Sequence, residues 1–325
     1  MTNTIASLAE IERVTRIVRE VVPPTPQQRW PLLDARAGAE VWVKHENHTC
    51  VGAFKIRGGL VYFHELLSSG EQVRGVVAAT RGNHGQAVGF AARRHGIPAA
   101  VVAPHGNSRE KNAAMRALGV ELIEHGADFQ ESLEFAQALA AERAWHRIPS
   151  FHRWLALGAA TGSLELLRGA PSLDAVYVPI GLGSGICGMV AARDALGLKT
   201  EVIGVCSASA RTYALSFAAR KPVSSPVTTE IADGMACRTP VDEALGIMYA
   251  GVSRIVEVTD AQITDAMRAY FSDTHNVAEG AGAAALAALL GEAARMRGRR
   301  VGLVLSGGNV DRDVYAKVLG GWSPK

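Results

Sequence analysis

The chain has 325 residues, 48% of them hydrophobic, with 34 Lys and Arg against 31 Asp and Glu. A chain of this length buries one large core or two cores that share an interface, and we favour two lobes. Its small basic excess is spread along the sequence, which argues against a nucleic-acid partner. No apolar stretch reaches membrane-spanning length, and the start MTNTIASLAEIERV lacks the pattern of a signal peptide, so we expect a cytoplasmic protein without a membrane partner.

Short β-branched runs alternate with Ala-rich stretches along the chain, which predicts an α/β fold around parallel strands. Two helix starts combine a capping residue with a partner three positions later, Asp128 with Glu131 and Thr259 with Gln262. Without a long linker or repeat, the second lobe is expected to be inserted into the first. We predict a large domain over 1–50 plus 155–325 and a small, mobile domain over 51–154. The expected strands are 41–43, 73–79, 99–103, 121–124, 175–179, 201–206 and 301–305.

The segment Val51-Gly-Ala-Phe-Lys55-Ile-Arg-Gly-Gly59 places one lysine among glycines and apolar residues. Partial desolvation there lowers the pKa of the amine and frees it to attack an aldehyde. A surface lysine at a helix start explains this segment equally well when it is taken alone.

Three later segments each follow a predicted strand. Thr80-Arg-Gly-Asn83-His84-Gly-Gln precedes an Ala-rich helix, whose free amides suit a carboxylate or phosphate, although an ordinary turn has the same pattern. Gly181-Leu-Gly-Ser-Gly-Ile-Cys-Gly188 is the best phosphate cradle, because successive glycines let backbone amides converge on an anion. Ser306-Gly-Gly-Asn309 ends the last strand, where a turn points polar groups into the ligand crevice of a parallel sheet.

Taken together and in this order, the four segments resemble the fold-type II pyridoxal-phosphate family of serine/threonine dehydratases and serine racemases, over almost the whole chain. Glu230-Ile-Ala-Asp-Gly234 and Val277-Ala-Glu279-Gly-Ala-Gly282 resemble two further segments of that family. The resemblance implies pyridoxal 5'-phosphate as cofactor and a homodimer. It also implies a tryptophan synthase β-like α/β fold with two open, twisted parallel-sheet lobes.

The resemblance also implies roles for individual residues. Lys55 is the catalytic residue and carries the cofactor, and Asn83 contacts the cofactor's 3-hydroxyl group. Ser306 binds the pyridine nitrogen, and this neutral partner makes the ring a weaker electron sink, which favours elimination. The implied cofactor-binding residues are Phe54, Lys55, Asn83, Gly181, Leu182, Gly183, Ser184, Gly185, Glu279 and Ser306. The implied substrate-binding residues are Thr80, Arg81, Gly82, Asn83, His84 and His152.

The implied reaction is the dehydration and deamination of a 3-hydroxy amino acid such as threonine or serine, giving a 2-oxo acid and ammonia. Alternative substrates are 3-hydroxyaspartate, phenylserine and an amino acid derived from hydroxyectoine, because one or two pocket residues decide such specificity. A β-replacement enzyme of the same fold is a second class. A non-catalytic cofactor carrier or a nucleotide-binding protein is a third, supported by the glycine segment alone.

The sequence departs from the family pattern in three places. Arg81 stands where the family usually has Ser or Ala, which disfavours racemisation, and it either pairs with a second substrate carboxylate or is solvated. Phe151-His152-Arg153-Trp154 replaces an Asp/Asn-rich pocket segment, which indicates an acidic or aromatic substrate side chain or a packed Trp154.

The third departure concerns metals. Cys206-Ser-Ala-Ser-Ala-Arg-Thr212 lacks the two acidic ligands of the racemase-like branch, and the four cysteines have no metal-ligand spacing, so we expect no metal at that position. The chain stops soon after Asn309, so we expect no C-terminal regulatory domain.

Overall fold

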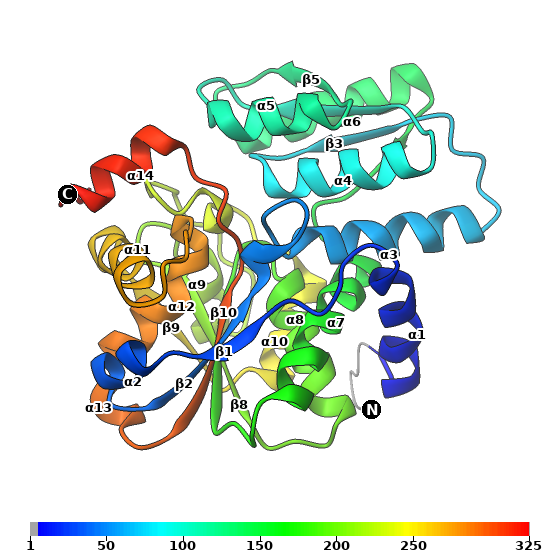
Figure 1. Cartoon of the computed structure of the whole chain (residues 1–325). Helices are drawn as coiled ribbons and strands as arrows, with labels where there is room; N and C mark the ends of the chain where they lie inside the picture. The colour runs from blue at the N-terminus through cyan, green and yellow to red at the C-terminus, as the bar shows by residue number, and fades with distance from the viewer. Residues whose placement is uncertain (1–5, 325) are drawn as a thin grey trace.

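Two open sheets organise the chain in a computed structural model that describes residues 6–324 (Figure 1). The larger sheet has the strand order β1-β2-β10-β7-β8-β9, and all of its neighbours pair in parallel except β1 with β2. Its strands are β1 (Gln27–Arg29), β2 (Glu40–His45), β7 (Ala175–Pro179), β8 (Glu201–Ser207), β9 (Arg254–Val258) and β10 (Arg300–Leu305).

The smaller sheet is wholly parallel, in the order β5-β4-β3-β6. Its strands are β3 (Val76–Ala79), β4 (Ala99–Ala103), β5 (Glu121–Glu124) and β6 (His146–Arg147). All four lie between β2 and β7 in the sequence, so this sheet is an insertion within the larger one. The proposed boundaries near residues 50 and 154, and the mobility of the small lobe, stay predictions.

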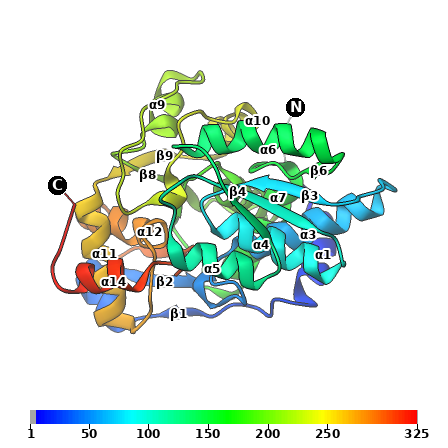
Figure 2. The same cartoon turned by 90° about the horizontal axis from the view of Figure 1, so that it is seen from above.

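Helices cover the sheets. Helix α6 covers one face of the small sheet, where it packs on Val77 and Val102, and α4 and α5 lie on the other face (Figure 2). The helices are α1 (Leu8–Arg19), α2 (Pro31–Ala37), α3 (Lys55–Ser68), α4 (Asn83–Arg94), α5 (Arg109–Ala117), α6 (Phe129–Arg143), α7 (Arg153–Gly169), α8 (Ser184–Ala195), α9 (Thr212–Ala219), α10 (Asp242–Gly251), α11 (Asp260–Thr274), α12 (Gly280–Gly291), α13 (Ala293–Met296) and α14 (Arg312–Leu319), with short 3-10 turns η1 (Glu46–His48) and η2 (Asp233–Met235).

Helix α3 runs between the two lobes and is fixed to the large one through α7 (Figure 1). A Cβ atom added at Gly158 would lie 2.4 Å from the carbonyl oxygen of Arg57, so the backbones of α3 and α7 are in direct contact there. This contact requires glycine, because any side chain would push the helices apart. It anchors the helix that begins at Lys55.

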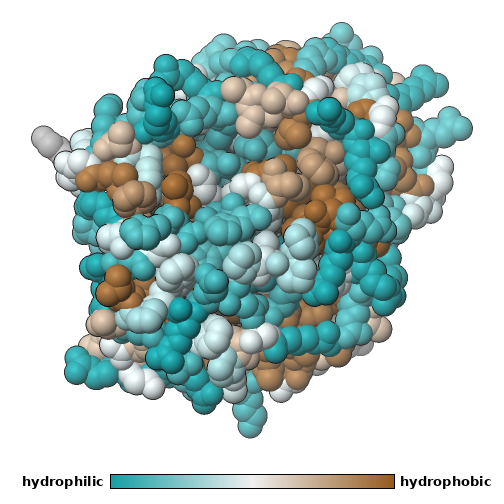
Figure 3. Space-filling view, viewed as in Figure 1, coloured by the Kyte–Doolittle hydropathy of each residue, from teal (hydrophilic) through white to brown (hydrophobic). Residues whose placement is uncertain are grey.

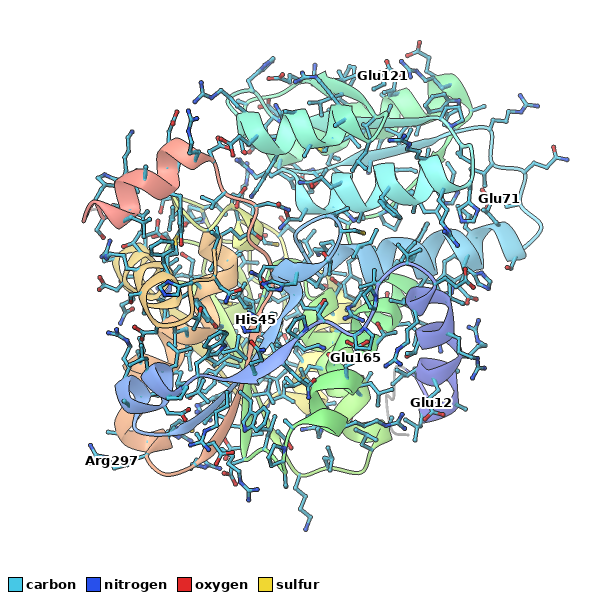
Figure 4. All side chains as sticks on the ribbon, viewed as in Figure 1. Glu12, His45, Glu71, Glu121, Glu165 and Arg297 are labelled. Atoms are coloured by element: carbon cyan, nitrogen blue, oxygen red, sulfur yellow. The ribbon has the colours of Figure 1, made fainter. Side chains whose placement is uncertain are left out.

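A network of buried charged side chains also fixes the start of α3. Arg57 is fully buried; its Nε donates to Glu46 Oε2 at 2.8 Å and its Nη2 to Glu165 Oε2 at 2.8 Å. Lys44 Nζ also donates to Glu165 Oε2, at 2.7 Å, and Figure 4 labels Glu165 on α7. Buried charges are tolerated when each has a partner, so this network fixes β2, η1, α3 and α7 relative to one another.

The structure differs from the sequence expectations in a few elements. Strands β1, β6 and β9 were not predicted; β1 and β6 are only three and two residues long, and β9 has two charged residues among its five and lies at the edge of its sheet. The capping box of Thr259 and Gln262 is complete. Asp128 caps α6 by accepting from the Glu131 amide, but the Glu131 side chain accepts from Ala127, one residue before the expected amide.

The face seen in Figure 3 is largely hydrophilic, and its apolar side chains form separate groups. Between residues 6 and 324, no helix is both long and apolar enough to cross a membrane. Within the same range, no group of His, Cys, Asp and Glu side chains is arranged to hold a metal ion. The expectation that no activating metal binds at the segment Cys206–Thr212 stays a prediction.

Candidate active site

A cavity of about 380 Å³ lies between the lobes, where strands β3, β7 and β10 end. Its position matches the crevice at the carboxyl ends of parallel strands, and its volume suits a small ligand. All of the predicted site residues except His152 line this cavity. Segments that are more than 200 residues apart in the sequence therefore meet at one place.

Backbone hydrogen bonds join three of these segments. The Phe54 amide donates to the Ser306 carbonyl at 3.0 Å, and the Glu279 amide donates to the Gly307 carbonyl at 3.1 Å. Ala53 and Gly307 also form an isolated antiparallel bridge. The residue before Lys55 is thus fixed to the turn that carries Ser306.

Lys55 is the first residue of α3, and its amine is enclosed by the cavity wall. Its Nζ atom lies 3.2 Å from Ser184 Oγ and 4.9 Å from the centre of the Phe54 ring. Burial lowers the pKa of Lys55 to about 8, although Glu279 opposes the shift. A larger fraction of this amine is therefore unprotonated near neutral pH than for an exposed lysine, which favours attack on a carbonyl group.

The start of α8 faces the same cavity. Gly183 is its N-cap with φ 105°, a conformation that favours glycine, and Ser184 begins the helix. A Cβ atom at Gly181 would lie 2.4 Å from the Gly234 carbonyl oxygen, so only glycine fits there. Free amides and the positive end of the helix dipole suit an anion such as a phosphate group.

The turn Thr80–His84 forms the small-lobe wall. The Gly82 amide donates to Thr80 Oγ1 at 3.0 Å, and Gly82 has φ 155°. Asn83 Nδ2 donates to Glu279 Oε1 at 2.6 Å, which connects the two lobes. Burial lowers the pKa of His84 to about 3, so the ring is neutral and contributes hydrogen bonding but no charge.

Lys111 and Asp233 line the cavity. The sequence reasoning missed Lys111, and it named the segment of Asp233 without giving that residue a role. Lys111 Nζ lies 2.6 Å from Asp233 Oδ2 and 3.0 Å from Glu279 Oε2. Burial alone would lower the pKa of Lys111, but the two carboxylates raise it, whereas burial raises the pKa of Glu279 despite Lys111. Lys111 follows Arg109 and Glu110, a charged run that is typical of a solvated helix face, so its burial carries no local signal.

His152 is the predicted substrate residue that the structure places elsewhere. It caps α7, where its Nδ1 accepts from the Trp154 amide at 3.2 Å. Its ring packs edge-on against Tyr62 and Trp154, with centroids 5.2 and 4.7 Å away. The capping bond turns the side chain toward its own helix, and Phe151 is the residue of this segment that reaches the cavity.

Two arginines, Arg81 and Arg147, also line the cavity. Arg81 Nε is buried, and the part of the chain that the structure describes provides it with no hydrogen-bond partner. A buried donor without a partner is uncommon in native proteins, and in a cavity a ligand or an ordered water can satisfy it.

The cavity therefore combines an amine of lowered pKa, an anion-binding helix start and, at the end of β10, the neutral hydroxyl group of Ser306. This set fits a ligand that bears both an aldehyde and a phosphate, because the amine forms a covalent bond with the first and the amides bind the second.

Comparisons with known proteins agree with this chemistry. The family described as pyridoxal-phosphate dependent enzyme matches residues 18–307. The chain is 32% identical over 314 residues to L-threonine ammonia-lyase of Thermotoga maritima, covering 96% of this chain and 78% of that protein. It is 33% identical over 300 residues to L-threo-3-hydroxyaspartate ammonia-lyase of a Pseudomonas species, covering 91% and 93%. The structure of maize serine racemase superposes with a TM-score of 0.90 at 28% identity, covering 98% of each chain.

Proposed function

The chain belongs to the pyridoxal-phosphate dependent enzyme family, and from this premise we propose that it removes the β-hydroxyl group and then the amine of a small 3-hydroxy amino acid. The products are a 2-oxo acid and ammonia. The enzyme is a pyridoxal-phosphate-dependent ammonia-lyase, as are the relatives that share about a third of its sequence. L-Threonine and L-serine are the first substrates to consider.

The main support for this proposal is that Lys55, the start of α8 and Ser306 line the same cavity. We propose that Lys55 holds the cofactor, that the amides from Gly181 to Gly185 bind its phosphate, and that Ser306 binds its pyridine nitrogen. Phe54, Asn83 and Glu279 also line the cavity and would contact the bound cofactor. A neutral hydroxyl partner leaves the pyridine nitrogen unprotonated, which suits elimination better than reactions that need a long-lived carbanion.

Bound pyridoxal phosphate withdraws electrons from the α-carbon of an amino acid attached to its aldehyde carbon. The protein supplies the proton transfers and the orientation. With the cofactor bound, the Lys55 amine would accept the substrate α-proton at Nζ, as its lowered pKa allows. The turn Thr80–His84 binds the substrate carboxylate and directs the Cα–H bond toward Nζ. The α-proton and the β-hydroxyl group would leave together as one water, and hydrolysis of the resulting unsaturated amine would give the 2-oxo acid and ammonia.

The purified protein tests this proposal directly. It should show a visible absorption band that borohydride abolishes, and peptide mapping should find the reduced cofactor on Lys55. Lys55→Ala should remove both the adduct and the release of 2-oxo acid, while Lys199→Ala, at an exposed lysine, should retain them. An adduct on another lysine, or turnover by Lys55→Ala, would overturn the assignment.

A 3-hydroxy amino acid with a second carboxylate, such as 3-hydroxyaspartate, is the alternative substrate that one observation favours. Arg81 lines the cavity with a buried and unpartnered Nε. A guanidinium group binds a carboxylate through two parallel hydrogen bonds. One of the relatives is named L-threo-3-hydroxyaspartate ammonia-lyase. Release of 2-oxo acid from a panel of threonine, serine, phenylserine and 3-hydroxyaspartate decides between the two candidates.

We also propose a homodimer in the cytoplasm. Among residues 6–324, the large apolar side chains that stay exposed lie on α2, on α11, just after α11 and near the C-terminus; they are Leu32, Phe271, Val277, Leu319 and Trp322. Helices α2 and α14 both contact α11, so these residues belong to neighbouring elements, at the left of Figure 1. Such a surface suits a second copy of the chain. Sedimentation of the wild type and of Phe271→Glu tests it, and a monomeric wild type would contradict it.

A further inference from the structure

We propose that Tyr213 is a positioning residue that aims the backbone amide of Gly183 at the cofactor phosphate. Tyr213 is the second residue of α9, directly after the segment Cys206–Thr212. It does not line the cavity, and its hydroxyl group contacts the glycine segment at Leu182. The inference depends on the proposed binding of the phosphate at the start of α8.

The Tyr213 hydroxyl group makes two hydrogen bonds, to residues of two different segments. It donates to the Leu182 carbonyl oxygen at 2.9 Å and accepts from the Val241 amide at 3.1 Å. Leu182 belongs to the glycine segment before α8, and Val241 is the residue before α10. One hydroxyl group therefore joins the starts of both helices and uses its donor and one acceptor position.

The bond to Leu182 fixes a peptide plane. In a trans peptide, the carbonyl of one residue and the amide of the next lie in one rigid plane and point in opposite directions. The described chain has no cis peptide bond. Tyr213 holds the Leu182 oxygen and does not line the cavity, so the Gly183 amide, which points the opposite way, is expected to face the cavity.

The glycine segment needs such a restraint because glycine permits many backbone conformations. Gly183 has φ 105°, and its peptide plane would rotate at little cost without a fixed partner. Binding an anion would then require ordering of the loop, which lowers the affinity. With Tyr213 in place, the amide is oriented before the phosphate arrives.

Burial stabilises the hydrogen bond between the Tyr213 hydroxyl group and the Leu182 carbonyl. The side chain is 2% exposed, and it packs within the large-lobe core that contains Cys187 and Met248. Burial also raises the pKa of Tyr213, so the hydroxyl group keeps the proton that it donates. A hydrogen bond made by such a buried hydroxyl group is stronger than one at the surface, because the local dielectric is lower.

The test uses the full chain after removal of the cofactor and compares two ligands. Tyr213→Phe removes one oxygen atom and keeps the ring. We expect it to weaken the binding of pyridoxal 5'-phosphate about tenfold, the effect of one buried hydrogen bond. Binding of pyridoxal, which lacks the phosphate, should be unchanged, because Lys55 and Ser306 are unaffected. Both dissociation constants are measured by tryptophan fluorescence and by absorbance of the bound cofactor.

Tyr249→Phe is the matched control. Tyr249 lies on α10, and its hydroxyl group donates to the Ser216 carbonyl at 3.0 Å without contacting the glycine segment. The substitution Tyr249→Phe should leave the affinity for pyridoxal 5'-phosphate and for pyridoxal unchanged. Thermal melting of both variants shows whether the fold is retained. Hydrogen exchange should be faster near residue 183 in Tyr213→Phe alone.

Two outcomes would overturn the inference. An equal loss of affinity for pyridoxal and its phosphate in Tyr213→Phe would mean a general disturbance of the site. Unchanged affinity for both, with unchanged exchange of the loop, would mean that the contact does not orient the amide. Neither outcome affects the proposed elimination reaction, because the assay of substrate turnover is separate.

Discussion

At the scale of the residue, the proposed attachment of the cofactor to Lys55 predicts a pH dependence that follows the pKa of this amine. Burial lowers that pKa to about 8, so the attacking amine is mostly protonated below this value and mostly free above it. The rate of attachment of pyridoxal phosphate to the cofactor-free protein should therefore rise with pH and level off above about 8. With a lysine of ordinary pKa, the rate of attachment would continue to rise up to about pH 10.4. Stopped-flow absorbance across this range measures the rate, and a continued rise beyond pH 9 would contradict the low pKa.

Arg81 provides a prediction about substrate choice at the same scale. Arg81→Ser removes the cation and introduces a residue common at this position in the resembled family. If Arg81 binds a second carboxylate, kcat/KM for L-threo-3-hydroxyaspartate should fall about 10- to 100-fold, the effect of a charged hydrogen bond, while that for L-threonine stays the same.

The control for Arg81 is Arg109→Ser, at a strongly exposed arginine that does not line the cavity. Steady-state kinetics measures kcat/KM for L-threo-3-hydroxyaspartate and for L-threonine in each variant and in the wild type. Equal losses for threonine and hydroxyaspartate in Arg81→Ser would show that Arg81 supports the turn and has no role in substrate choice.

At the scale of the element, the two ends of α8 differ in function although glycine with positive φ stands at both. Gly183 precedes the helix and Gly197 follows it, with φ 105° and 65°. A Cβ atom at Gly183 would lie 2.8 Å from Ala244 Cβ and 2.9 Å from Met248 Cε, whereas one at Gly197 meets nothing within 4 Å.

We therefore expect different results from alanine at these two positions. Gly197→Ala should cost about 1 kcal/mol of folding free energy from backbone strain and leave cofactor affinity intact. Gly183→Ala should cost more, because steric overlap adds to the strain, and it should also weaken cofactor binding. Denaturant unfolding and cofactor titration measure both effects. Equal cofactor affinities in the two variants would contradict the assignment of this end of α8 to the phosphate.

At the scale of the whole molecule, polar contacts across the cavity join the lobes. Lys111 of the small lobe pairs with Asp233 and Glu279 of the large lobe, and it is 5% exposed. Lys111→Met should destabilise the protein by about 3–5 kcal/mol, because it leaves a buried carboxylate without its cation. Arg109→Met removes an exposed pair with Asp313, also between the lobes, and should cost under about 1 kcal/mol.

The pH dependence of Lys111→Met has a defined sign. Burial raises the pKa of Glu279, and loss of the cation raises it further. A carboxyl group whose pKa is higher in the folded state favours folding below its unfolded pKa and loses that contribution as pH rises. The stability deficit of the variant should thus be larger at about pH 8 than at about pH 5. Denaturant unfolding at both pH values measures it, and a deficit that is independent of pH would contradict the role of Glu279.

Much of the fold was predictable because its signals are local. The predicted strands at 99–103, 121–124 and 175–179 agree with β4, β5 and β7 to the residue, since β-branched runs bounded by turns stand out in the sequence. Short edge strands such as β6 have no such signal. Of the predicted site residues, all but His152 line one cavity, because glycine-rich segments after strands mark the same sheet edge.

The sequence by itself determined the α/β class, the order of the glycine-rich segments and the lysine proposed to carry the cofactor, because these depend on residue type and spacing along the chain. Only the tertiary structure decided which residues complete the site. Lys111, Asp233 and Tyr213 have roles that depend on burial and on partners more than 20 residues away. His152 has the right residue type but turns to cap its own helix. Desolvation and long-range contact exist only in the folded chain, so no local pattern reports them.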